Sequence, residues 1–169
     1  MIDVGYVIVS STAAPEAFFE RWTAHETYPE WSARTEWLHL DEPVAIGASG
    51  QVKSTTGEPL TVRITALNPP YVYSETTELD GAELTVQHEA RPTDDGSRVE
   101  LRAWLEGPRA ADLELEFRAN MQRALEEDIK ALVELVEGKR PDLADSSATT
   151  DGAHPHEDLD SSEQDSSRR

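Results

Sequence analysis

Residues 109–137, RAADLELEFRANMQRALEEDIKALVELVE, form the longest segment of the chain with one regular apolar period. At about 1.5 Å per residue, a helix of this length runs on the order of 40 Å, enough to span a small domain. Gly138 and Pro141 supply a stop signal directly after it. Apolar side chains recur at three- and four-residue intervals, the period of an amphipathic helix: Phe117, Met121, Ala124, Leu125, Ile129, Leu132 and Val136. The sequence therefore predicts one long helix whose apolar face needs a partner layer.

The partner layer is predicted in residues 33–106, where short segments alternate in polarity and turn residues such as Asp80-Gly81 and Asn68-Pro69-Pro70 separate them. Strict alternation indicates antiparallel strands with one covered face and one solvated face. Tyr73 shares a strand face with Glu75, and the pattern leaves open whether that face is covered. The three clearest covered faces carry Leu60, Val62, Ile64 and Ala66; Leu84, Val86, His88 and Ala90; and Val99, Leu101, Ala103 and Leu105.

The N-terminal segment precedes this meander with a strand and two short helical pieces. Residues 4–10 are rich in β-branched side chains, and Pro15 then suits the first turn of a helix. Phe18 and Trp22, four residues apart, can bury one face of that helix, and Tyr28-Pro29 interrupts the second helical piece. The aromatic side chains around these pieces are expected to plug one end of the core, with gating of an entrance as the alternative.

Charge separates the chain into an acidic domain and an acidic tail. The 169 residues carry a net charge of −19, of which −15 falls on residues 1–138. We expect residues 139–169 to be a disordered tail, because they hold too few apolar side chains to offset the entropy of ordering. His154-Pro155-His156 within this tail could attract a metal ion, but two histidines on such a segment are more often incidental, so no metal is expected.

Composition excludes several classes of function. An acidic surface repels phosphate backbones and anionic headgroups, which argues against nucleic acid and membrane surfaces as partners. The absence of cysteine excludes disulfides and thiolate chemistry. No apolar run reaches membrane-spanning length, and no zinc, nucleophile-elbow, phosphate-loop or dinucleotide motif is present. We therefore expect a cytoplasmic protein, monomeric by default, with no cofactor.

The order of elements, together with particular residues, resembles the START-like (SRPBCC, helix-grip) superfamily, nearest the polyketide cyclase/dehydrase and lipid-transport family. The residues that carry the resemblance are Ala14-Pro15-Glu16, Tyr28-Pro29-Glu30-Trp31, Asn68-Pro69-Pro70 and Leu125-Glu126-Glu127-Asp128-Ile129. The resemblance spans essentially residues 3–138. It implies an α+β helix-grip fold: a curved antiparallel sheet of about seven strands, two short helices after the first strand, and one long C-terminal helix packed across the sheet.

The resemblance also implies a cavity between the sheet and the long helix that holds a hydrophobic or aromatic small molecule. Small residues on the covered faces, Ala66, Ala90 and Ala103, agree with a void there or with close approach of the helix. The candidate ligand contacts come from the covered strand faces and the inner stripe of the helix: Val62, Ile64, Tyr73, Val86, His88, Leu101, Ala103, Phe117, Asn120 and Met121.

Two polar residues fall on surfaces that should be apolar, and they are the catalytic candidates. His88 shares a face with Leu84 and Val86, where a neutral imidazole can exchange a proton near neutral pH. Asp128 falls on the apolar stripe of the long helix. Its role is either proton transfer or, the interpretation we favour, a structural hydrogen bond or ion pair, for example with Trp22 or a backbone amide.

Three functions fit these observations. The preferred hypothesis is a module that binds a hydrophobic small molecule. The second is a polyketide cyclase or dehydratase that uses His88 or Asp128 as general base. The third is a protein-interaction domain whose acidic exterior and tail dock a basic partner.

Overall fold

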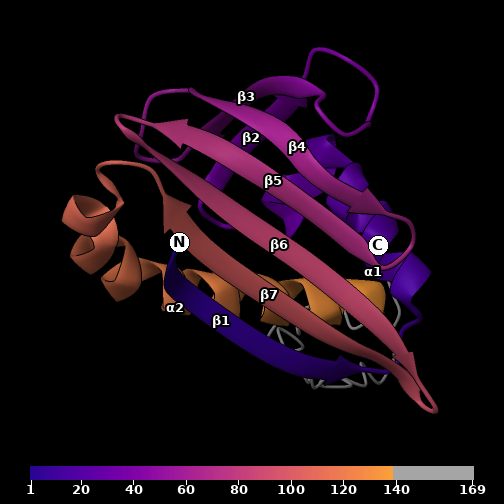
Figure 1. The fold of residues 1–169 in the computed structure, drawn as a ribbon. Helices are drawn as coiled ribbons and strands as arrows, with labels where there is room; N and C mark the ends of the chain where they lie inside the picture. Colours follow the sequence, from indigo (N-terminus) through magenta and orange to yellow (C-terminus); the bar gives the residue numbers. More distant parts are fainter. Residues whose placement is uncertain (139–169) are drawn as a thin grey trace, which may run out of the picture.

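The structure, a computed structural model, describes residues 1–138. Its elements run along the chain in the order β1 (Ile2–Ser11), α1 (Pro15–Thr23), η1 (a 3-10 helix, His25–Glu30), β2 (Thr35–Leu40), β3 (Ser49–Ser54), β4 (Leu60–Asn68), β5 (Val72–Leu79), β6 (Ala82–Thr93), β7 (Gly96–Glu106) and α2 (Ala110–Val136). The seven strands form one antiparallel sheet in the order β1-β7-β6-β5-β4-β3-β2, and α2 runs across one face of it (Figure 1). The predicted fold class is confirmed.

The hairpin between β5 and β6 shows how local sequence sets this meander. Leu79 pairs with Ala82, so Asp80-Gly81 is a two-residue connection. Such connections favour Asp-Gly because the turn requires positive φ, and Gly81 has φ of 76°. The pairing continues without a shift from Leu79 to Val72, which places Glu75 opposite Val86 and Tyr73 opposite His88.

Helix α2 is attached to the sheet mainly through β1. Ala124, Leu125, Ile129 and Leu132 are its buried apolar side chains in the central and C-terminal part, as the period predicted. Gln122 adds a polar link: its Oε1 accepts a hydrogen bond from the Tyr6 backbone N–H at 2.9 Å, and its Nε2 donates to the Tyr6 carbonyl at 2.9 Å. The Gln122 side chain therefore hydrogen-bonds to both backbone groups of Tyr6 on the edge strand β1 and fixes the position of α2 along that strand.

Two covered-face predictions are wrong. Leu60, at the start of β4, is 40 % exposed. Ala66 lies with Arg63 and Ser74 on the outer face of the sheet, because a bulge between Ile64 and Ala66 shifts the alternation by one residue. Leu67 packs against the core in its place. The alternation of the β6 and β7 segments holds, and Ala90, Val99, Leu101, Ala103 and Leu105 are all buried.

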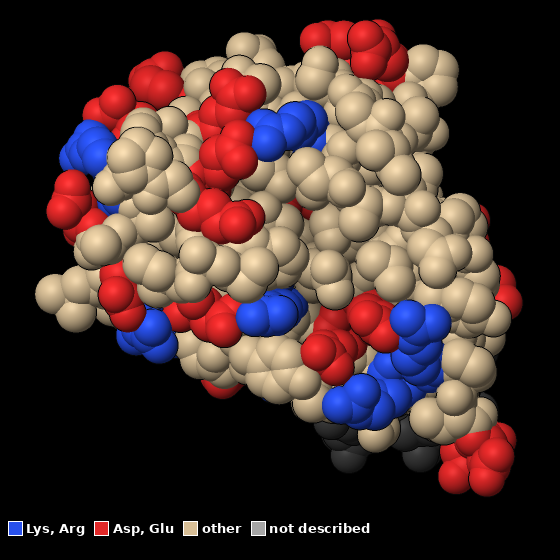
Figure 2. Space-filling model, viewed as in Figure 1, with Lys and Arg blue, Asp and Glu red and all other residues tan. Residues whose placement is uncertain are grey.

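Charged side chains of both signs occupy the exterior. The face in Figure 2 shows acidic residues with basic residues between them. Arg63 contacts Glu83 at 2.7 Å, and Arg102 contacts Asp3 at 2.8 Å. These ion pairs are exposed, so each contributes about 1 kcal/mol or less. Docking of a basic partner on this exterior stays a prediction, and the acidic tail proposed to assist it lies outside the described residues.

Candidate functional site

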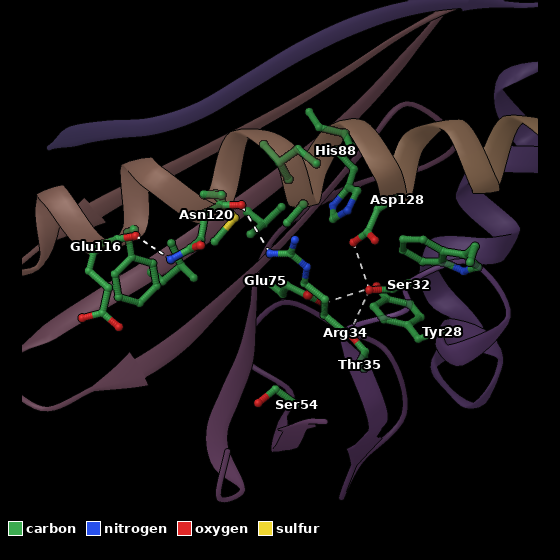
Figure 3. Close-up of a pocket in the computed structure, with 18 residues that line it drawn as sticks. Tyr28, Ser32, Arg34, Thr35, Ser54, Glu75, His88, Glu116, Asn120 and Asp128 are labelled. Atoms are coloured by element: carbon green, nitrogen blue, oxygen red, sulfur yellow. Dashed lines mark hydrogen bonds between the residues drawn. The ribbon is translucent and has the colours of Figure 1, made fainter. Parts of the chain in front are cut away.

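A cavity of about 360 Å³ lies between α2 and the sheet, beside the segment after η1 (Figure 3). Apolar side chains supply much of its wall: Trp31, Leu84, Val86, Leu101, Phe117, Met121, Ala124 and Leu125. Polar side chains also line it, and they are Tyr28, Ser32, Arg34, Thr35, Ser54, Glu75, His88, Glu116, Asn120 and Asp128. A mostly apolar hollow with a few polar groups is the usual form of a small-molecule site.

The structure brings six of the ten predicted ligand contacts to the cavity wall: Val86, His88, Leu101, Phe117, Asn120 and Met121. Val62, Ile64, Tyr73 and Ala103 are not among the lining residues. Each of these four is at most 1 % exposed within the apolar core, where packed neighbours occupy the space over the side chain. Strand alternation assigns a residue to a face, but it does not say whether a void or another side chain lies above it.

Glu75 is the residue that the sequence-based candidates missed. It lies on the inner face of β5 and lines the cavity. Its Oε2 accepts hydrogen bonds from Tyr73 Oη at 2.8 Å and from Tyr28 Oη at 3.3 Å. Burial raises its pKa from the usual 4.5 to about 7, against the lowering effect of these two hydrogen bonds. The sequence showed that Tyr73 and Glu75 share one face of a strand. Only the assembled sheet shows that this face points toward the cavity.

The two tyrosines extend Glu75 into a buried hydrogen-bond network. Tyr28 Oη also contacts the Trp22 carbonyl oxygen at 2.9 Å, and Tyr73 Oη lies 2.8 Å from His25 Nε2. Desolvation raises the pKa of both phenols well above 10 and lowers the pKa of His25. Both phenols are therefore neutral near neutral pH. Tyr73 donates to Glu75, whereas Tyr28 shares its one proton between Glu75 and the nearer Trp22 carbonyl oxygen.

His88 lies in an aromatic cluster at the inner wall of the cavity. Its ring centroid is 5.3 Å from that of Trp22, 5.6 Å from Tyr73 and 6.5 Å from Trp31. The residue is 3 % exposed, and burial lowers its pKa from 6.5 to about 3, so the imidazole is neutral. Its Nδ1 is buried without a hydrogen bond of normal geometry among the described residues, and the Tyr73 backbone contacts the ring closely enough to offset part of the lowering of its pKa. A ligand that reaches Nδ1 would complete its hydrogen bonding.

Asp128 extends from α2 into the same cavity (Figure 3). Its Oδ2 accepts a hydrogen bond from Ser32 Oγ at 2.9 Å, so the partner is a serine side chain and neither Trp22 nor a backbone amide, the two examples suggested by the sequence. Burial raises the pKa of this carboxyl from 3.8 to about 6, while Ser32 and the charge of Arg34 lower it in part. The carboxyl is therefore poised to gain or lose a proton near neutral pH.

Arg34 ties the segment after η1 to α2 across the cavity. Its Nη1 donates to the Asn120 carbonyl oxygen at 3.3 Å, and its Nη2 lies 3.4 Å from Glu127 Oε2. Both partners lie on α2, and the Arg34 side chain keeps 40 % of its surface exposed. Ser32 and Arg34 thus close one side of the cavity through hydrogen bonds to Asp128, Asn120 and Glu127 of α2.

Comparisons with known proteins find similarity in structure only. Neither protein-family models nor curated proteins match the chain. Among solved structures, the di-domain ARO/CYC StfQ from the steffimycin biosynthetic pathway aligns with a TM-score of 0.68 at 13 % identity, covering 82 % of this chain and 52 % of StfQ. Ara h 8.0201 aligns at 0.63 with 15 % identity, covering 79 % and 96 % of the two chains. Protein MLL2253 from Mesorhizobium loti aligns at 0.65 with 16 % identity, covering 80 % and 97 %.

The chain has the START-like helix-grip fold. The predicted resemblance is thereby confirmed for the fold, which is as far as identities of this size reach. In this helix-grip domain the cavity occupies the space between the gripped helix α2 and the sheet, the place that the resemblance implied.

Metal ligation and membrane crossing find no support in the helix-grip domain. Within residues 1–138, no group of three or more His, Asp or Glu side chains is arranged to hold a metal ion. Within the same range, none of the helices combines the length and apolar character needed to cross a bilayer. His154-Pro155-His156 lies outside the described residues.

Proposed function

We propose that this domain binds a hydrophobic or aromatic small molecule in the cavity beneath α2. The observation that carries the proposal is a cavity of about 360 Å³ with a mainly apolar wall inside a domain whose remaining core side chains are nearly fully buried. The hollow is partly open to solvent, since the exposed residues Glu116 and Asn120 are among those that line it. A partly enclosed hollow with a mainly apolar wall is the usual form of a small-molecule site.

The structural neighbours add support of a weaker kind. StfQ is described as an ARO/CYC of a biosynthetic pathway, and its matching half shares the scaffold with this chain. A shared fold supports a pocket beneath the long helix, but it does not identify the substrate.

Filling the cavity with a side chain should abolish binding. Ala124 lines the cavity and is 8 % exposed, so Ala124→Phe places a ring in the void. We expect the uncharged fluorescent probe N-phenylnaphthylamine to bind the natural protein and to lose at least roughly tenfold in affinity on this change. Fluorescence titration measures the affinity, and circular dichroism checks that the fold is retained.

Ala119→Phe is the matched control, because Ala119 lies on the exposed face of the same helix. We expect it to leave probe affinity unchanged within about twofold. Met121→Trp offers a second way to fill the cavity should Ala124→Phe unfold the protein. Equal probe binding by the cavity variants and the natural protein, or no binding by any of them, would reject the proposal.

A second candidate function, acid–base catalysis on the bound molecule, is favoured by Glu75. A half-buried carboxyl with a pKa of about 7 is suited to accept or donate a proton near neutral pH, and two tyrosines contact it at the cavity wall. This extends the cyclase or dehydratase hypothesis from His88 and Asp128 to Glu75. His88 becomes the weaker base, since its pKa of about 3 leaves it little affinity for a proton.

The catalytic candidate predicts that the protein accelerates deuterium exchange at the carbon between the carbonyls of an aromatic β-diketone in heavy water. Glu75→Gln should remove at least roughly 100-fold of that acceleration, a typical contribution of a general base, while the diketone still binds. Proton NMR measures the exchange. An unchanged rate in Glu75→Gln would exclude this residue as the base.

A further inference from the structure

The charges at the cavity wall are unbalanced. Among the described residues, no Lys, Arg or His nitrogen lies within salt-bridge distance of Glu75 or Asp128. Glu116 is a third carboxylate that lines the cavity. Buried carboxyl groups in proteins are generally paired with a cation, because desolvation of an unpaired charge is costly. Within residues 1–138 neither Glu75 nor Asp128 is in salt-bridge contact with a cation, and Arg34 acts on Asp128 only through its charge at longer range.

Hydrogen-bond acceptors at the wall are also unused. Donors from the described part of the chain reach only Glu75 Oε2 and Asp128 Oδ2, which leaves Glu75 Oε1 and Asp128 Oδ1 open to a further donor. Within the same part of the chain, the buried His88 Nδ1 also lacks a hydrogen bond of normal geometry, and its tautomer decides whether it donates or accepts. Figure 3 shows the Glu75, His88 and Asp128 side chains directed toward the space beneath α2. An occupant that brings hydrogen-bond donors would satisfy these open groups.

Aromatic rings supply a third contribution. Tyr28, Trp31 and Phe117 line the cavity, and the Tyr28 and Trp31 ring centroids are 4.6 Å apart. The faces of such rings attract cations, with a gain that grows when water is excluded. Tyr28 and Trp31 are 3 % and 4 % exposed, so their rings leave little face open to a ligand, and the half-exposed Phe117 supplies the more accessible ring. Rings and carboxyls in one cavity therefore favour the same kind of ligand group.

We infer that the ligand is an amphiphilic amine: an apolar, aromatic or aliphatic body that fills the cavity and a protonated nitrogen that pairs with Glu75 and Asp128. This inference rests on the proposed function, since it assigns a chemical class to the molecule bound there. The protonated nitrogen supplies the missing positive charge and donates to Glu75 Oε1, Asp128 Oδ1 or both, while the aromatic rings pack against the body.

An anionic ligand fits these residues less well. Arg34 is the basic side chain at the cavity wall, and Glu127 and the Asn120 carbonyl already engage its guanidinium. A carboxylate placed beneath α2 would meet Glu75, Asp128 and Glu116, and like charges in a desolvated site repel one another strongly.

Binding of an amine should release protons. The titratable or charged groups that face Glu75 and Asp128 are Tyr28 from η1, Arg34 from the following loop, Tyr73 from β5, His88 from β6, and Glu116 and Glu127 from α2. A cation beside the two carboxyls lowers the pKa of both, so carboxyls that hold protons in the free protein lose them. With pKa values of about 7 and 6, the pair together holds about one proton at about pH 6.5.

Three probes of one shape test the inference: naphthylethylamine, naphthylethanol and naphthylacetic acid. Isothermal titration calorimetry at about pH 6.5, in two buffers of different ionisation enthalpy, measures both affinity and proton release. We expect the amine to bind at least roughly tenfold more tightly than the alcohol, the acid to bind most weakly, and only the amine to release close to one proton.

The outcomes separate the amine assignment from the proposed function. An alcohol that binds as tightly as the amine, or tighter binding of the acid, overturns the amine assignment and leaves small-molecule binding intact. Failure of all three probes to bind counts against both.

Charge-neutral variants localise the effect. Glu75→Gln and Asp128→Asn should each reduce amine affinity roughly tenfold and change alcohol affinity by less than about threefold. Glu78→Gln is the matched control, because Glu78 lies on the same strand and pairs with Arg63, away from the cavity. An equal loss of amine affinity in Glu78→Gln would mean that overall charge governs binding, and the inference would fail.

Discussion

Replacing Glu75 by Gln is expected to make the protein more stable at pH 8, by up to about 3 kcal/mol. Burial raises the folded-state pKa of Glu75 from 4.5 to about 7, so the folded state holds more protons than the unfolded state between these values. The contribution of Glu75 to the free energy of unfolding therefore falls as pH rises from about 4.5 to 7, and the loss is complete above that range. Gln keeps the shape and the acceptor for the tyrosine hydroxyls but never ionises.

Urea denaturation of both proteins at several pH values from about 4 to 8 measures this effect. The prediction concerns the difference in unfolding free energy between the variant and the natural protein at each pH. The absolute value is less informative, because titration of His88 changes stability with pH in the opposite direction. Its folded-state pKa is lowered to about 3, so its contribution to stability rises with pH up to about 6.5 and partly hides that of Glu75. The two proteins should differ least near pH 4, where Glu75 is protonated in both states.

Glu78→Gln again serves as control, and because this side chain is exposed we expect it to change stability at pH 8 by less than about 1 kcal/mol. A Glu75→Gln variant that is less stable than the natural protein at pH 8 would contradict the prediction. That result would mean that hydrogen bonds from Tyr73 and Tyr28 favour the ionised carboxylate by more than burial disfavours it.

Replacing Gly50 by Ala is expected to destabilise the domain on the order of 3 kcal/mol or more. Gly50 pairs with Leu40 on β2, and a β-carbon added there would lie 1.9 Å from the His39 carbonyl oxygen and 2.7 Å from Leu40 Cα. Both atoms belong to the backbone, so relief requires β2 and β3 to move apart and gives up hydrogen bonds between them. Denaturant titration followed by tryptophan fluorescence measures the loss.

Gly57→Ala is the control for this change. The nearest atom to its added β-carbon is Ser54 Oγ at 2.8 Å, the movable end of a side chain on the surface. We expect a change within about 1 kcal/mol. Equal stability of Gly50→Ala and the natural protein would contradict the close approach of β2 to Gly50.

Most of the architecture could be predicted from local sequence. The three- and four-residue spacing from Phe117 to Val136 identifies α2, and Asp80-Gly81 identifies a two-residue hairpin. Alternation on β6 placed His88 and Val86 on one inner face, and the cavity lining includes both. These features depend on neighbours within a few residues, since helix and strand periods convert spacing along the chain directly into a common face.

The candidate site depended on contacts that local spacing does not encode. The bulge after Ile64 moved Ala66 to the outer face, and packed neighbours separate Val62 from the cavity. Ser32 meets Asp128 from a loop 96 positions away along the chain. Such outcomes are set by register between strands and by what lies across from each side chain, both of which are properties of the assembled layers.

Glu75 is the clearest example of a site residue whose role depends on tertiary contacts. Alternation along the chain is enough to show that Tyr73 and Glu75 share one face of a strand within an acidic, cysteine-free domain. The folded domain shows that this face is the covered one, where burial beneath α2 raises the pKa of the Glu75 carboxyl to about 7. The reason is that alternation fixes the relative orientation of neighbouring side chains, whereas desolvation depends on the layer that packs over them.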